Sequence, residues 1–165
     1  MVAVVFLSCA HDPVKDDLVV YVNDDLLRIV DLESAALARY HAVTGKNYKD
    51  DATLVMTLNG YVIPQYKRFL GLLRKIRPAT HETQVLHRMY LQGVERMYDG
   101  FCMLRTALEK QDPVLFRFAN EKITQGRETI ERFTAELDGI CEAHGLSLQR
   151  KGEVKETFWE RMGFF

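Results

Sequence analysis

The segment from Asp112 to Gly145 carries the strongest helix signal in the sequence and constrains the fold more than any other feature. Asp112 supplies a side-chain acceptor at the N-cap, and Pro113 occupies the first helical position, where a missing N–H has no cost. Gly145 can adopt the left-handed conformation that ends many helices. Apolar or small residues recur between them at steps of three and four: Phe116, Ala119, Ile123, Gly126, Ile130, Phe133, Leu137 and Ile140. Such a seam requires partner helices packed at a shallow angle.

Three earlier stretches have the length and periodicity to supply those partners. The pattern predicts helices over about 12–43, 50–77 and 80–110, with Pro64 kinking or breaking the second. Their connections are short, so consecutive helices are expected to be antiparallel neighbours. The predicted fold is therefore all-α: an antiparallel up-down-up-down four-helix bundle at 12–145, between an apolar arm at 1–11 and a short helical tail at 146–165. We expect the seams to leave no interior room for reactive groups.

Composition narrows the class of protein. A chain of 165 residues with 47% hydrophobic residues is one domain by size and can form a core. The formal net charge of −1, with acids and bases interspersed, gives no field suited to nucleic acid. No stretch has the roughly eighteen consecutive apolar residues of a membrane-spanning helix.

The first ten residues, MVAVVFLSCA, are nearly all apolar. They lack the basic segment of a secretory signal, but Phe6-Leu7-Ser8-Cys9 is similar to a bacterial lipobox, in which the cysteine is acylated. Cys9 is therefore a candidate lipid anchor, and the expected location is the cell envelope or periplasm. The alternative is a cytoplasmic protein whose apolar arm packs on the bundle.

Motifs for catalysis or cofactor binding are absent from the sequence. It contains no Glu-x-x-His pair, no Cys-x-x-Cys-His, no P-loop and no nucleophile elbow. Three polar residues fall on helix seams, namely Glu33, Gln65 and His87, but the helix rise places them at different levels of the bundle. We expect each to be isolated and satisfied locally.

One group of zinc-type ligands shares an end of the bundle: Cys9, His11, Cys141 and His144. Its spacing matches no established zinc pattern, so we interpret Cys141 as a buried thiol and His144 as a helix-terminal histidine. Cys102 and Cys141 are expected to lie about 28 Å apart along the helices, too far for a disulfide. We predict no metal, no cofactor and no enzymatic activity.

The aromatic tail offers a candidate interaction surface. Its four large aromatic residues are Phe158, Trp159, Phe164 and Phe165. They are expected to cap the open end of the bundle, and the alternative is that they dock a partner or touch a bilayer surface.

Several short runs carry a resemblance over about 12–146. They are Val62 to Phe69, Ile76-Arg77-Pro78, Leu108 to Pro113, Ala119 to Lys122 and Gly126-Arg127. In these runs the chain resembles a group of uncharacterised bacterial lipoproteins, small helical proteins carried outside the cytoplasmic membrane. The resemblance brings no catalytic motif, and the one functional position it implies is the anchor Cys9.

The sequence therefore favours a non-enzymatic envelope protein, lipid-anchored, with an unknown protein partner or a structural role. Membrane contact is expected through the lipid anchor, and no nucleic acid is expected. Two alternatives stay open: a cytoplasmic helical adaptor, and a small-ligand or metal-binding bundle. A cavity between helices with converging polar groups would support the last of these.

Overall fold

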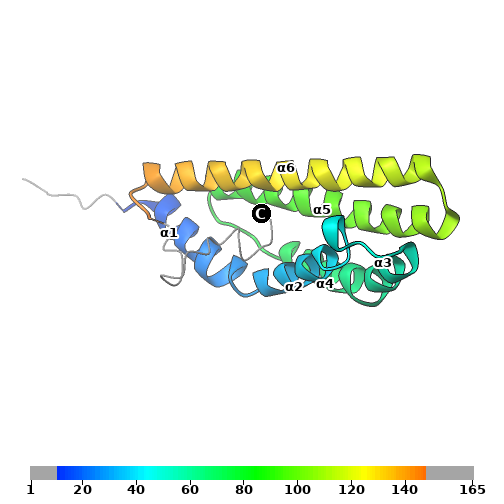
Figure 1. Ribbon diagram of the computed structural model, residues 1–165. Coiled ribbons are helices and arrows are strands. Elements are labelled where there is room, and N and C mark those ends of the chain that lie inside the picture. The colour runs from blue at the N-terminus through cyan, green and yellow to red at the C-terminus, as the bar shows by residue number, and fades with distance from the viewer. Residues whose placement is uncertain (1–10, 148–165) are drawn as a thin grey trace, which may run out of the picture.

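The computed structural model describes residues 11–147, and every regular element within that range is helical (Figure 1). The described part runs from α1 (Pro13–Val20) through the π-helical turn η1 (Tyr21–Leu26) to α2 (Val30–His41). The 3₁₀ turn η2 (Gly45–Asn47), α3 (Asp51–Thr57), the π-helical turn η3 (Leu58–Val62) and α4 (Ile63–Leu73) follow. Two long helices complete it, α5 (His81–Lys110) and α6 (Pro113–Ala143).

Helices α5 and α6 form a long antiparallel hairpin, and their bounds confirm the sequence prediction. Asp112 caps α6 by accepting hydrogen bonds from the backbone of Val114 and Leu115, each at 3.0 Å. Gln111, at φ 52°, makes the tight turn between the helices, and Gly145, at φ 65°, follows the end of α6. The hairpin is close-packed because glycines remove side chains from the interface: a Cβ added to Gly126 would lie 2.8 Å from the carbonyl oxygen of Gly93.

The first expected helix, 12–43, is not continuous, so that prediction was wrong. After α1 the backbone widens into η1, where the amide of Leu27 donates to the carbonyl of Val22, five residues earlier. Residues 27–29 then form turns before α2 starts. The added residue in the π-helical turn shifts the side chains that follow it, which bends the path of the chain.

The second expected helix is present as α3, η3 and α4, with its interruption beside Pro64. Asp50 caps α3 by accepting from the amide of Thr53 at 2.6 Å. Pro64 is the second residue of α4, separated from the π-helical turn by Ile63 alone, and this position near the turn accommodates the missing N–H. Helix α4 packs against α2 and α5.

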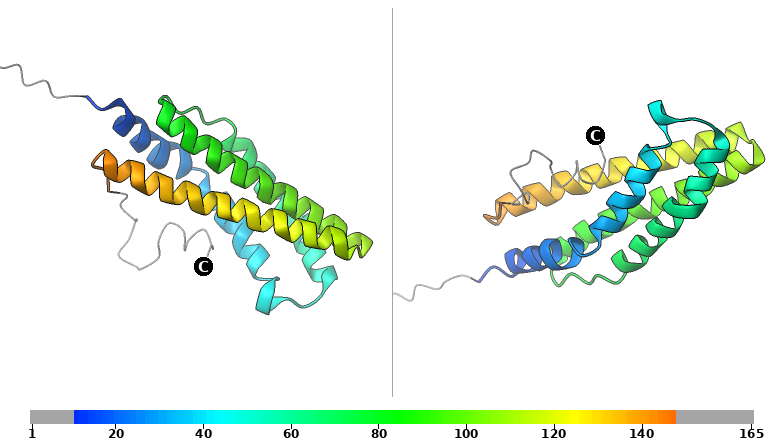
Figure 2. Two further views of the ribbon diagram at one scale, coloured as in Figure 1. Left: turned by 90° about the horizontal axis from the view of Figure 1, so that it is seen from above. Right: turned by 60° about the horizontal axis from the view of Figure 1, so that its bottom comes forward.

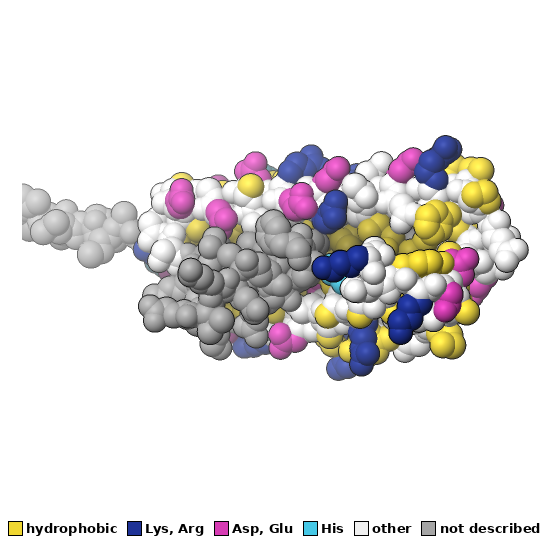
Figure 3. All heavy atoms as spheres, in the orientation of Figure 1, with side chains coloured by type: hydrophobic (Ala, Val, Ile, Leu, Met, Phe, Trp, Pro, Cys, Tyr) yellow, Lys and Arg dark blue, Asp and Glu magenta, His cyan; other side chains and the backbone are white. Residues whose placement is uncertain are grey.

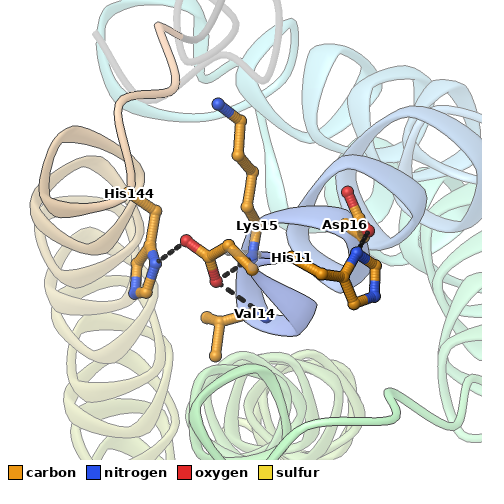
Figure 4. A network of polar contacts seen from close by, with 6 residues as sticks. His11, Val14, Lys15, Asp16 and His144 are labelled. Carbon is orange, nitrogen blue, oxygen red and sulfur yellow. Dashed lines mark hydrogen bonds and ion pairs between the residues drawn. The ribbon is translucent and has the colours of Figure 1, made fainter. Parts of the chain in front are cut away.

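Polar contacts tie α1 to both long helices. The Asp17 carboxylate accepts from the amides of Ala79 and Thr80 at 3.0 and 2.8 Å, which caps the start of α5 from another helix. Burial opposes ionisation of Asp17, but these hydrogen bonds outweigh it and lower its pKa. Asp12, the N-cap of α1, contacts the ring of His144 at 2.7 Å (Figure 4). The two ends of the described chain therefore meet at one end of the molecule (Figure 1).

Helix α2 does not stay alongside α6. Figure 2 shows α5 running beside α6 along the whole molecule, whereas α2 crosses at an angle and diverges. Phe116, expected in the buried seam of α6, is 40% exposed as a result. The expectation of a closed interior was therefore wrong at this place. Among the described residues, no helix combines the length and apolar character needed to cross a membrane.

Candidate functional site

The divergence of α2 from α6 opens a cleft of about 830 Å³. Its walls are the end of α2, the η2 loop, the start of α3 and the first half of α6, and α5 forms its base. Figure 3 shows the hollow, with a hydrophobic floor and Lys or Arg side chains at its edge. This volume falls within the range of small-molecule sites in proteins.

The floor of the cleft is apolar because apolar residues of four helices face it. Leu37 of α2 and Leu54 of α3 contribute, together with Met97 and Leu104 of α5. Phe116 and Ile123 of α6 complete it, seven residues apart. Seven residues rise about 10.5 Å along a helix, so the apolar lining is elongated along the hairpin.

The edge of the cleft is polar and is held by a tight turn after α2. The hydroxyl of Thr44 donates to the carbonyl of Tyr40 at 2.9 Å, and the side-chain amide of Asn47 donates to the carbonyl of His41 at 3.1 Å. These two bonds satisfy carbonyls at the end of α2. On the far side of the loop, the Tyr48 hydroxyl donates to Asp51 at 2.7 Å, so the loop is bonded at both sides and forms one wall.

The charges at the cleft are mainly positive. His41, Lys46 and Arg127 line it, and Asp51, the acidic residue of the lining, is already bonded to Tyr48. Desolvation and then the charge of Arg127 lower the pKa of His41. Burial raises the pKa of Tyr40 to about 12, which keeps its hydroxyl neutral. Arg127 also pairs with Glu131 along α6, at 3.6 Å.

A buried carboxylate lies directly beneath the floor. Glu33 is fully buried and accepts hydrogen bonds from the hydroxyls of Tyr66 at 3.0 Å and Tyr90 at 2.5 Å. Burial raises its pKa to about 7, although the two hydroxyl bonds act in the opposite direction. The Tyr66 hydroxyl also lies 3.4 Å from the sulfur of Met97, a floor residue. The Tyr66 hydroxyl therefore lies between the carboxylate and Met97, a residue of the cleft floor.

The prediction that the polar seam residues are satisfied locally was wrong for two of them. Glu33 is bonded to two other helices, and the ring of His87 lies 3.3 Å from the hydroxyl of Tyr21. The partners are tyrosines, because a buried tyrosine hydroxyl itself requires a hydrogen-bond partner. Glu33 and His87 still do not share a hydrogen bond. Gln65 is half-buried and takes part in neither the Glu33 contact nor the His87 contact.

The residues expected to form sites have separate outcomes. The anchor candidate Cys9 and the aromatic residues Phe158, Trp159, Phe164 and Phe165 lie outside the described residues. Among residues 11–147, no three or more His, Cys, Asp or Glu side chains are grouped to hold a metal ion. His144 pairs with Asp12, and both Cys102 and Cys141 are free thiols, as expected.

Comparison with known proteins gives no relative from which a function can be transferred. No family model matches the chain, and neither a curated protein nor a solved structure shows significant similarity to it. The site must therefore be interpreted from its own geometry.

Sequence reasoning missed the cleft because its residues looked ordinary. Phe116 and Ile123 carry the same periodic signal as the fully buried residues of α6. One signal was available: Thr44 to Asp50 is rich in turn residues, and Tyr48 stands in it as a large aromatic side chain. A tyrosine in a short polar connection indicates a loop that lies over an apolar surface.

Proposed function

We propose that this protein is a non-enzymatic, all-helical binding protein and that the cleft between α2 and α6 takes a small, elongated, partly apolar ligand. One observation carries the proposal: an open cleft of about 830 Å³ with an apolar base and polar groups at its edge. Ligand sites in proteins have this composition, in which apolar walls provide affinity and a few polar groups provide orientation.

The lining supports binding better than catalysis. The described residues around the cleft include one histidine, His41, and one carboxylate, Asp51, which is bonded to Tyr48. The buried Glu33 is closed off by the floor, and both of its oxygens accept from tyrosine hydroxyls. A general acid–base pair requires groups within hydrogen-bond reach of a substrate.

The fold and the location form a second part of the proposal. We propose that the chain keeps the up-down-up-down order of a four-helix bundle, in which 13–41 and 51–73 each act as one bent helical segment. The short connections before α5 and α6 support this order. We also propose that Cys9 carries a lipid, so that the cleft is held at the cell envelope. Mass spectrometry of the natively expressed protein tests this, and an unmodified Met1 would exclude it.

Probe binding tests the role of the cleft. The amphipathic dye 1-anilinonaphthalene-8-sulfonate should bind the full-length protein at one saturable site. Thr124→Phe places a ring at the cleft, whereas Gln125→Phe places the same ring on the next exposed position of α6, outside the lining. Thr124→Phe should weaken binding at least about tenfold, equivalent to about 1.4 kcal/mol, and Gln125→Phe should not. Equal behaviour of the two variants would refute the proposal.

A further inference from the structure

The two ends of the cleft differ in chemical character. Arg127 and His41 both line the cleft, while Phe116, another lining residue, lies eleven residues before Arg127 on α6, about 16 Å away by the helical rise. Ile123, which is partly buried, adds apolar surface between Phe116 and Arg127 on α6. A ligand matching both parts has a charged group at one end and an apolar body behind it.

The sign of the required charge follows from the residues present. Lys46 and Arg127 are cationic and His41 is basic, whereas Asp51 is the single acidic residue of the lining and accepts a hydrogen bond from the Tyr48 hydroxyl. Glu131 neutralises Arg127 in part, but at 3.6 Å along one exposed helix face this is a weak pair. Arg127 retains further N–H donors in a planar fork, a geometry that suits a carboxylate.

Arg127 and Lys46 give a reason for an anion to bind here, because both are cations that line the cleft. His41 lines the same cleft, and desolvation followed by the charge of Arg127 lowers its pKa. An anion bound beside the imidazole would favour its charged form. The floor beneath offers no competing cation, because its members are Leu37, Leu54, Met97 and Leu104.

We propose that the ligand is an amphipathic monoanion, a single-chain alkyl carboxylate whose head binds between Arg127 and His41 and whose chain lies along the floor toward Phe116. The proposal rests on the proposed function of the cleft and specifies its ligand class. The exposed apolar surface of the cleft then has an occupant, since a bound chain covers the exposed Phe116 and the partly buried Ile123.

The head group is tested by comparing probes of one chain length on the full-length protein. Isothermal titration calorimetry should show dodecanoate binding below its micellar concentration, with dodecanol and dodecyltrimethylammonium at least about tenfold weaker. Acetate should not bind detectably, because it lacks the chain. Equal affinity for dodecanol and dodecanoate would overturn the ligand class while leaving the cleft as a binding site.

The chain offers a matched pair of variants. Arg127 and Arg117 are exposed arginines of α6, and each is paired with a glutamate four residues on, at 3.6 and 3.8 Å. Arg117 does not line the cleft. Arg127→Gln should weaken dodecanoate binding at least about tenfold and leave dodecanol unchanged, whereas Arg117→Gln should alter neither. Equal losses in the two variants would indicate a diffuse charge effect and overturn the proposal.

Other occupants give different results. Trp159 is the one tryptophan of the chain and lies in the segment after residue 147. If Thr124→Phe alone, without any probe, shifts the Trp159 emission to the red, the chain's own C-terminal segment occupies the cleft and the proposal is overturned. If no probe of any charge binds, the proposed function itself fails.

Discussion

Glu33 is the residue whose environment departs furthest from that of an ordinary carboxyl group. It has no exposed surface, and its neighbours are hydroxyl donors in place of cations. The two tyrosine hydroxyls, both neutral because burial raises the pKa of Tyr66 and Tyr90, can satisfy its oxygens without cancelling a charge. Because burial disfavours the charged form and no cation offsets it, the pKa of Glu33 moves upward to about 7. The protonation of Glu33 is therefore linked to folding.

The sign of this linkage gives a prediction for Glu33→Gln. The folded protein holds the Glu33 proton up to pH about 7, whereas the unfolded chain releases it near the ordinary value of 4.5. Between these pH values the native state binds more protons, so Glu33 makes stability fall as pH rises, by about 3 kcal/mol in total. In urea titrations, the stability of Glu33→Gln relative to the wild type should rise over this window.

Comparing Glu33→Gln with the wild type separates the effect of Glu33 from that of groups whose contribution to stability changes with pH in the opposite direction. Burial lowers the pKa values of His41 and His87, which makes stability rise with pH through the same range. The wild type and Glu33→Gln both contain these histidines, so the histidine contribution cancels in the difference between the two stabilities. Glu128→Gln, an exposed glutamate of α6, is the control and should show no such window. A flat difference for Glu33→Gln would mean that Glu33 is ionised in the folded protein at low pH.

At the scale of elements, the α5–α6 hairpin depends on glycines, whose lack of a side chain lets the two helices pack closely. A Cβ at Gly126 would lie 2.5 Å from the Met97 Cγ atom and 2.9 Å from its backbone nitrogen. Backbone atoms cannot move aside as a flexible side chain can, so the helices would have to separate. Gly139, on the same helix, has no atom within 4 Å of the same position.

This contrast predicts opposite effects of one substitution on one helix. Gly126→Ala should destabilise the protein by about 1–3 kcal/mol through overpacking of the interface. Gly139→Ala should stabilise it by about 0.5–1 kcal/mol, because alanine loses less backbone entropy in an open helical position. Chemical denaturation followed by circular dichroism measures both. Stabilisation by Gly126→Ala would show that the helices are less closely packed than the structure has them.

The same elements show how far sequence reasoning reaches. The bounds of α5 and α6 could be predicted because Thr80, Asp112 and Gly145 mark them locally. The break after α1 could not, because the π-helical turn contains residues that also suit a regular helix, Tyr21 to Leu26. The Glu33 cluster was likewise out of reach: its donors come from α4 and α5, and their meeting depends on tertiary packing. Periodicity indicates which face is apolar, not whether a partner covers it.

At the scale of the whole molecule, polar contacts join α1 and the π-helical turn η1 after it to the hairpin. Asp12 reaches His144 at the end of α6, Asp17 caps the start of α5, and Tyr21 meets His87 inside. The helix is only eight residues long, with Leu18 its one fully buried member. Such an element is expected to open at a lower free energy than the long hairpin.

This arrangement predicts a local effect of His144→Ala. The contact of His144 with Asp12 lowers the pKa of that carboxyl and links the two ends of the described chain. Its loss should speed amide hydrogen exchange severalfold in α1 and leave the centres of α5 and α6 unchanged, because those exchange through wider opening. His11→Ala is the matched control: His11 pairs with Asp16 at 3.3 Å, close by in Figure 4, but both side chains are exposed. An exposed pair contributes little, so α1 should exchange at the wild-type rate in that variant. If the two variants accelerate α1 equally, or if His144→Ala accelerates the whole hairpin, α1 is not held as a separate unit by its contact with α6.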